Sequence, residues 1–253
     1  MPGIDDLVSA YKMFVATRHS NYVQNYDSTE KTNPDGAKFE AACYWMLRSR
    51  GLNVQIGDTE AEGGADFLCS SASCRFVVEA TTINTWAMER KTGMKHDQTA
   101  VSGGWFTAFP TLYQKLTGKI RQVKKYNLPR MVAVGSFHNE SFALFRHVMA
   151  DEYLSIFFNC DNPNSVKPQE TLKDISAFAL IAFGQERYSA VAFLNPAPTH
   201  YFGIQFLPNM WFRQITNIGL TDGTLLGEWV GTKSNGLHSF EYPFEITEAC
   251  PTT

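Results

Sequence analysis

Two short apolar segments, each carrying one carboxylate, constrain this sequence more than any other stretch. Residues 63–68 read Gly-Gly-Ala-Asp-Phe-Leu, and residues 75–81 read Arg-Phe-Val-Val-Glu-Ala-Thr. The connector between them is small and polar, which is typical of a hairpin turn between two strands. We therefore expect Asp66 and Glu79 to lie on adjacent antiparallel strands.

The pairing register determines how the two carboxylates meet. If Ser70 pairs with Arg75, Asp66 lies directly across from Glu79 on the same face of the sheet. Opposed like charges destabilise a sheet, so such a pair requires a compensating cation. Two carboxylates that share a site form an all-oxygen environment suited to Mg²⁺ or Mn²⁺. In the alternative arrangement the two side chains point to different sides, and each meets solvent or an arginine.

Composition places the chain among globular proteins. Its 253 residues are 44% hydrophobic and 13% aromatic, and we expect one domain over residues 1–253. No apolar run approaches the roughly 18 residues that span a bilayer, and the first residues lack a signal-peptide layout. Five scattered cysteines match neither a disulfide framework nor a zinc site. These features predict a cytoplasmic protein with no membrane partner.

The net charge of −3 hides a strongly basic segment. Residues 90–130 contain nine basic residues and one acid, Asp97, which gives this segment a net charge of +8. A polyanion such as nucleic acid would be attracted to it. The alternative is a solvated helix face followed by a loop. The residues predicted to contact nucleic acid are Arg90, Lys91, Lys95, Lys115, Arg121, Lys124 and Lys125.

A helix with clear end signals precedes the hairpin. Asn33 is suited to the N-cap, Pro34 to the first helical position, and Gly51 to the position just past the end. Glu40 shares a helical stripe with Tyr44, which predicts that its side chain points inward. An ordinary surface position is the alternative for Glu40.

The remaining pattern alternates helices and strands. An amphipathic helix over residues 111–126 has Lys115, Lys119 and Gln122 on one stripe. The order predicts an α/β fold, a three-layer α/β/α arrangement with a mixed central sheet. The other predicted segments are helical residues 4–26 and 139–158, a polar break at 27–33, an irregular region at 84–110, strands at 53–57, 131–135, 175–183 and 188–194, and a hairpin within 215–229.

This order resembles the PD-(D/E)XK nuclease superfamily, which has the restriction-endonuclease-like fold. The residues that carry the resemblance are an inward Glu40 on a helix, Asp66 opening one strand and Glu79 inside the next, followed by a Lys/Gln helix and a further strand. The similarity covers residues 34–136 as a nuclease-like core. Residues 137–253 would add a helix and β-hairpins that complete the sheet.

The resemblance implies a metal-dependent phosphodiester hydrolase, with Mg²⁺ or Mn²⁺ as cofactor, that acts on DNA rather than RNA in restriction, repair or defence. Asp66, Glu79 and the backbone carbonyl of Ala80 would be the metal ligands. Glu40 would orient a metal-bound water or join a second metal. Because cleavage of both strands often uses two active sites, a homodimer also fits the resemblance.

Thr81 departs from the family pattern, which has lysine two residues after the Glu. A hydroxyl can donate a hydrogen bond to water or phosphate but supplies no positive charge. Lys119, with Gln122 beside it, is our candidate for the missing cation; a phosphate contact or simple solvation is the alternative for Lys119. If the chemistry is lost, the chain is a catalytically inactive nucleic-acid-binding or partner-binding protein on the same fold.

Overall fold

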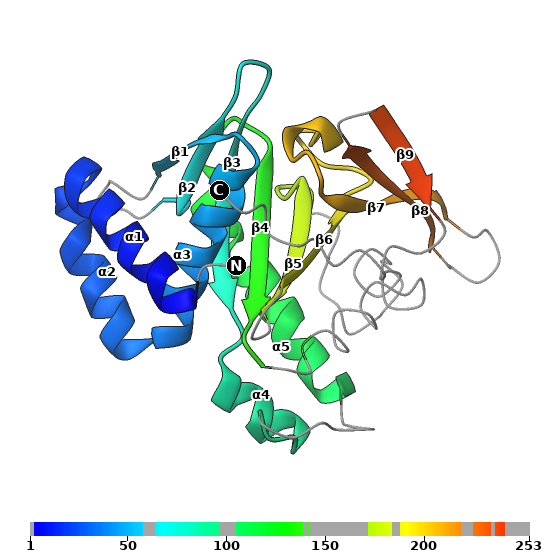
Figure 1. Ribbon diagram of the computed structural model, residues 1–253. Helices are drawn as coiled ribbons and strands as arrows, with labels where there is room; N and C mark the ends of the chain where they lie inside the picture. Colours follow the sequence, from blue (N-terminus) through cyan, green and yellow to red (C-terminus); the bar gives the residue numbers. More distant parts are fainter. Residues whose placement is uncertain are drawn as a thin grey trace.

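One mixed sheet of nine strands runs through the part of the chain that the computed structural model describes, and neighbouring strands follow sequence order (Figure 1). That part comprises residues 3–57, 64–96, 105–138, 141, 172–183, 188–218, 225–233 and 236–240. The pairs β3–β4, β4–β5 and β6–β7 are parallel, and the others are antiparallel. The strands are β1 (Asn53–Ile56), β2 (Phe67–Ser70), β3 (Arg75–Thr82), β4 (Arg130–Ser136), β5 (Ala177–Phe183), β6 (Tyr188–Leu194), β7 (Trp211–Ile218), β8 (Leu225–Lys233) and β9 (Gly236–Phe240).

Helices cover both faces of the sheet, as expected for an α/β protein. Because side chains alternate along β3, Phe76 and Val78 pack into the core beneath α1 and α3, while Val77 packs against Val123 of α6 on the other face. The helices are α1 (Ile4–Arg18), α2 (Ser20–Thr32), α3 (Pro34–Ser49), α4 (Thr85–Thr92), α5 (Trp105–Gly118) and α6 (Ile120–Lys124), with a 3₁₀ turn at Ile204–Phe206.

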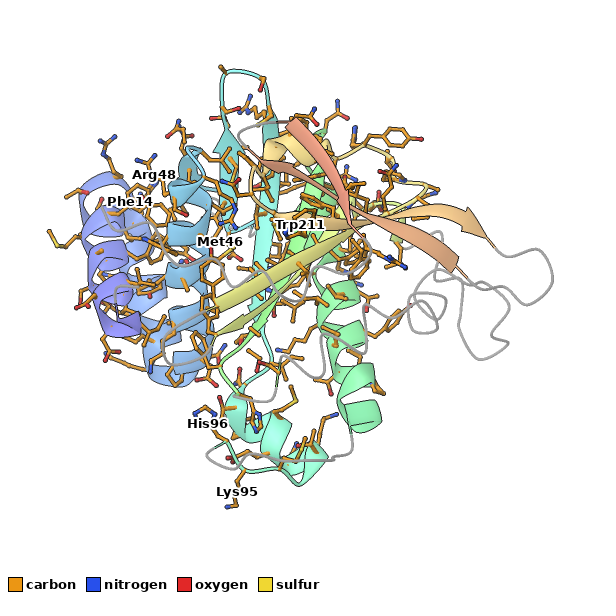
Figure 2. All side chains as sticks on the ribbon, turned by 45° about the vertical axis from the view of Figure 1, so that its right-hand side comes forward. Phe14, Met46, Arg48, Lys95, His96 and Trp211 are labelled. Atoms are coloured by element: carbon orange, nitrogen blue, oxygen red, sulfur yellow. The ribbon has the colours of Figure 1, made fainter. Side chains whose placement is uncertain are left out.

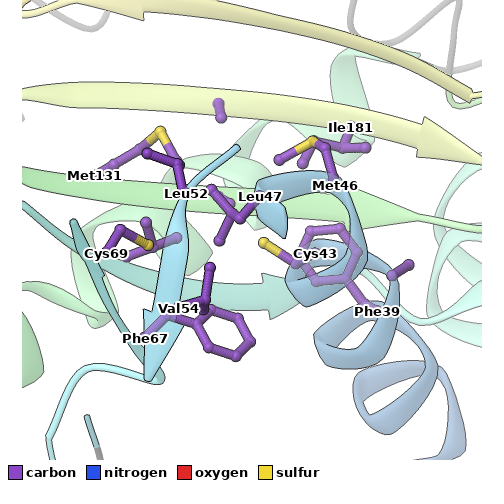
Figure 3. Close-up of a cluster of buried hydrophobic side chains, with 14 of the residues drawn as sticks. Phe39, Cys43, Met46, Leu47, Leu52, Val54, Phe67, Cys69, Met131 and Ile181 are labelled. Carbon is purple, nitrogen blue, oxygen red and sulfur yellow. The ribbon is translucent and has the colours of Figure 1, made fainter. Parts of the chain in front are cut away.

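Helix α3 is the element that joins the main core to the candidate site. Its apolar face is fully buried against the sheet (Figure 3). The contact with β4 is so close that a Cβ at Gly135 would lie 1.9 Å from Cε2 of Phe39, which requires glycine there. The helix begins as predicted, with Asn33 Oδ1 accepting a 3.3 Å hydrogen bond from Gly36 N, and Gly51 follows its end with φ +78°.

The hairpin has the predicted register. Ser70 pairs with Arg75 and Phe67 with Val78, so the same alignment places Asp66 beside the middle of β3. The hairpin strands at residues 175–183 and 188–194 are also confirmed as β5 and β6. The predicted helix at 139–158, except for Ser141, and the turn at residues 221–224 lie outside the described residues.

Two predictions of local structure were wrong. The break at 27–33 is instead the end of α2, which continues to Thr32. The predicted irregular region at 84–110 contains α4 and the start of α5, and its residues 97–104 lie outside the described part of the chain. Helix α4 depends on tertiary contacts, since Thr85 N donates a 2.7 Å hydrogen bond to Asp35 Oδ2 and Met88 is buried. Among the described helices, none is long and apolar enough to cross a membrane.

Candidate functional site

A polar cavity of about 450 Å³ brings together most of the residues predicted to be catalytic. Glu40 lies on α3, Asp66 is the residue just before β2, and Lys119 lies at the junction of α5 and α6. The wall on the β3 side is formed by Ala80 and Thr81. Five predicted residues from four parts of the chain therefore line one cavity.

Asp66 is held in place through its backbone and its side chain. Asp66 O accepts a 2.9 Å hydrogen bond from Gly57 N, and Asp66 Oδ2 accepts a 2.6 Å bond from Ala80 N. The Tyr126 hydroxyl links the same two segments, because it accepts from Ala65 N and donates to Gly57 O, both at 3.3 Å. The Asp66 carboxylate is thus tied to β3 beside Glu79.

Glu79 lies behind the cavity wall, and its carboxylate is fully buried. Its Oε1 is 2.7 Å from Lys119 Nζ, and its Oε2 has no hydrogen-bond partner within the described part of the protein. Burial raises the pKa of Glu79 well above its usual range; the charge of Asp66 raises it further, and Lys119 only partly opposes this.

Lys119 provides the compensating cation that the opposed carboxylates require. Burial alone would lower the pKa of Lys119, but the carboxylates of Glu79, Asp66 and Glu40 outweigh burial and raise it. Its side chain is 28% exposed and reaches the cavity from the junction of α5 and α6. Lys119 therefore remains charged and lies where it can face both Glu79 and a bound ligand.

Glu40 points inward, as its helical stripe predicted. It is 8% exposed, and its Oε1 accepts hydrogen bonds from the hydroxyls of Tyr11 at 2.6 Å and Tyr22 at 3.0 Å. The pKa of Tyr11 is raised well above its usual value, first by burial and then by the charge of Glu40. Tyr11 consequently stays protonated as a donor, and Glu40 is held as a buried carboxylate at the edge of the cavity.

Gln122 is the predicted catalytic residue that the structure does not bring to the others. It lies on α6, where its backbone N donates to Lys119 O at 3.2 Å. Among the described residues that line the cavity, Gln122 is absent. The break between α5 and α6 at Lys119 interrupts the single helix that would have carried both side chains on one stripe.

The predicted nucleic-acid contacts divide into two groups. Three residues lie on or just after α4, which follows the end of β3, and three lie on or just after α6, which precedes the start of β4. Because β3 and β4 are parallel, the two groups lie at opposite ends of the sheet, with Lys115 of α5 between them. The first group is Arg90, Lys91 and Lys95, and the second is Arg121, Lys124 and Lys125.

Arg130, counted in the basic segment, serves a structural role instead. It is 5% exposed, and its guanidinium donates to the carbonyls of Tyr126 and Lys124 and to Asp174. The positive charge available to a ligand is therefore smaller than the sequence total indicated.

Sequence reasoning missed the wall that α2 contributes. Tyr22, Asn25, Ser28 and Thr29 all line the cavity, at the spacing of three and four residues that marks one face of a helix. Tyr11 and Tyr22 could also have been expected to bond a buried polar group such as Glu40, because a buried tyrosine hydroxyl usually needs a hydrogen-bond partner.

The donor atoms present suit a divalent cation with oxygen ligands. Within the described residues, no group of three or more His, Cys, Asp or Glu side chains is arranged to hold a metal ion. A metal would therefore rest on Asp66, Glu79 and backbone oxygen such as that of Ala80. The buried Glu79 Oε2, which lacks a hydrogen-bond partner in the described part of the chain, is the atom best explained by such a ligand role.

In chemical terms, the site combines three carboxylates and one lysine around a polar cavity. Such a set can bind a cation, hold a water molecule and place a positive charge beside an anionic substrate. No protein-family model, curated protein or solved structure matches this chain. The function is therefore inferred from the geometry of the site.

Proposed function

We propose that this protein is a metal-dependent phosphodiester hydrolase of the PD-(D/E)XK type, acting on nucleic acid, with DNA as the first substrate to test. The observation that carries the proposal is the meeting of Glu40, Asp66 and Lys119 at one cavity, with Lys119 bonded to the buried Glu79. These residues come from separate elements, so local sequence does not account for their meeting.

Asp66, Glu79 and the carbonyl of Ala80 are the residues that would hold Mg²⁺ or Mn²⁺. When bound, the ion would lower the pKa of water and offset negative charge on the phosphate. Lys119 supplies the fixed positive charge that the family has at the position of Thr81. The Thr81 hydroxyl, at the cavity wall, donates a hydrogen bond to a phosphate oxygen or a water.

Glu40 serves to orient a water and accept its proton. Its two tyrosine donors fix the direction of its carboxylate. The basic residues of α4 and α6 would contact backbone phosphates.

Cleavage assays with plasmid DNA, linear DNA and RNA, each with and without Mg²⁺ or Mn²⁺, test the proposal. We expect metal-dependent cleavage by the native protein that is lost in Asp66→Asn and Glu79→Gln. Asp5→Asn, which removes an exposed carboxylate in the first turn of α1, is the matched control and should cleave normally. No cleavage of any substrate, together with no metal binding by calorimetry, would refute the proposal.

A second candidate is a catalytically inactive nucleic-acid-binding protein on the same framework. Two observations favour it: Thr81 stands in place of the family lysine, and the Glu79 side chain is fully buried behind the cavity. This candidate predicts salt-dependent binding of nucleic acid that is unchanged by Asp66→Asn, with no cleavage under any metal condition.

A further inference from the structure

A second surface cavity, of about 300 Å³, lies at the C-terminal ends of α1 and α3. Its lining combines basic and aromatic side chains with the edge strand of the sheet. Figure 2 shows Phe14 and Arg48 near one another there, at the end of the molecule away from Lys95. The main lining residues are Phe14, Arg18, His19, Tyr44, Arg48 and Gln55.

The two cavities lie at different positions along α3, which packs side by side with α1 (Figure 1). Tyr11 meets Glu40, and the ring of Phe14 then stacks on that of Tyr44, with centroids 4.4 Å apart and an interplanar angle of 28°. Arg48 is eight residues beyond Glu40 on the same face of α3, which corresponds to about 12 Å along the helix. The second cavity is thus separate from the candidate active site.

Within the described residues, the two arginines of this cavity have no carboxylate partner. In the part of the chain described, neither Arg18 nor Arg48 forms an ion pair, and no acidic residue is among those lining the cavity. Arg48 Nη1 donates a 3.1 Å hydrogen bond to Leu52 O, which anchors its guanidinium beside β1. Both side chains are exposed, so their charges are accessible to a bound anion.

Both arginines line the cavity beside Tyr44. Burial raises the pKa of the Tyr44 hydroxyl, and Arg48 and Arg18 both oppose that rise. Both arginines and the stacked Phe14–Tyr44 ring pair thus belong to one cavity lining. β1 contributes the exposed side chains of Asn53 and Gln55, whose amides can donate further hydrogen bonds.

We propose that this cavity binds a phosphate group, carried either by a free nucleotide or by the backbone of a nucleic-acid strand. Guanidinium groups match phosphate oxygens in charge and in bidentate geometry, and two of them line this cavity. The stacked rings of Phe14 and Tyr44 form an apolar wall for whatever the phosphate is attached to. The proposal does not depend on cleavage chemistry at Asp66 and Glu79.

Calorimetry without divalent metal tests the site with four probes. These are inorganic phosphate, a nucleoside 5′-monophosphate, the same nucleoside without phosphate, and a single-stranded oligonucleotide without terminal phosphate. We expect at least one phosphate-bearing probe to bind the native protein. The affinity of that probe for Arg18→Gln and for Arg48→Gln should be lower by about tenfold or more. Lys173→Gln, which removes one exposed charge elsewhere, is the matched control and should bind normally.

The probes separate the two sources of phosphate. A free nucleotide is the ligand if the monophosphate binds more tightly than inorganic phosphate and the arginine variants leave oligonucleotide binding unchanged. A strand is the ligand if the variants weaken the oligonucleotide and reduce the slope of its salt dependence by about one charge.

Equal affinity in the native protein and both arginine variants, or no binding of any phosphate-bearing probe, would overturn the proposal. Because Arg48 also donates a hydrogen bond to Leu52 O, the thermal stability of Arg48→Gln must be measured alongside its binding. Arg18 donates no hydrogen bond to the described residues, so the binding result for Arg18→Gln decides the outcome. Asp66→Asn should keep phosphate binding here even where it abolishes cleavage, which separates this site from the proposed active site.

Discussion

Lys119 Nζ lies 2.7 Å from Glu79 Oε1, and this ion pair joins the junction of α5 and α6 to the centre of β3. The Glu79 side chain is fully buried while the Lys119 side chain is partly exposed. A pair of this kind is costly to break on one side, because the remaining charge is left in the interior without compensation. It therefore connects the stability of the fold with the electrostatics of the candidate site.

Removal of the lysine should destabilise the protein through Glu79. We expect Lys119→Met to lower the free energy of unfolding by about 3 kcal/mol, measured by urea denaturation. In a Glu79→Gln background the same change should cost much less, because no buried charge is left behind. Lys115→Met, one turn earlier, is the control; it should change stability by about 0.5 kcal/mol or less, since no ion pair of Lys115 appears in the described residues. An equal cost of Lys119→Met in both backgrounds would contradict this role.

Metal binding should depend on pH through Glu79. Burial and Asp66 raise the pKa of Glu79, and a metal ligand must be deprotonated. Between the ordinary pKa of a glutamate and the raised value, binding of Mn²⁺ must release a proton, so affinity should fall as pH falls through this window. Calorimetry in two buffers of different ionisation enthalpy measures the proton release directly. Affinity that does not change with pH would rule out Glu79 as a ligand.

Removal of a tyrosine hydroxyl that bonds Glu40 should lower the free energy of unfolding more than removal of a hydroxyl that bonds a neutral group. We expect Tyr11→Phe to lower the free energy of unfolding by about 2 kcal/mol, because a buried carboxylate loses a 2.6 Å hydrogen bond. Tyr26→Phe is the control, since its hydroxyl donates to the backbone oxygen of Ala37, and it should cost about 1 kcal/mol. If the two variants are equally stable, the Tyr11–Glu40 hydrogen bond contributes no more to stability than the Tyr26–Ala37 hydrogen bond.

The contact between α3 and β4 should not tolerate a side chain at Gly135. A Cβ there would lie 1.9 Å from Phe39 Cε2, so we expect Gly135→Ala to destabilise the protein by about 3 kcal/mol in thermal or chemical unfolding. Gly118→Ala is the control, because a Cβ at the end of α5 meets nothing within 4 Å of the described atoms. The smaller side chain of Phe39→Leu should partly rescue Gly135→Ala, and no rescue would place the strain elsewhere.

The local sequence determined those parts of the site that depend on short-range periodicity. The hairpin register followed from the strand pattern and the polar connector, because a shift of one residue would turn every apolar side chain to the wrong face. The inward direction of Glu40 followed from the helical stripe it shares with Tyr44, and the start of α3 from Asn33 and Pro34.

Only the tertiary structure decided which partners these residues have. Lys119 reaches Glu79 because α6, which begins just after it, packs on β3. Tyr11 and Tyr22 reach Glu40 because α1 and α2 pack on α3. The basic segment divides into two groups because α4 follows the end of β3, whereas α6 precedes the start of β4. Since β3 and β4 are parallel, these two points lie at opposite ends of the sheet. Hydrogen bonds and ion pairs between distant segments depend on packing in three dimensions, and no local periodicity in the chain encodes them.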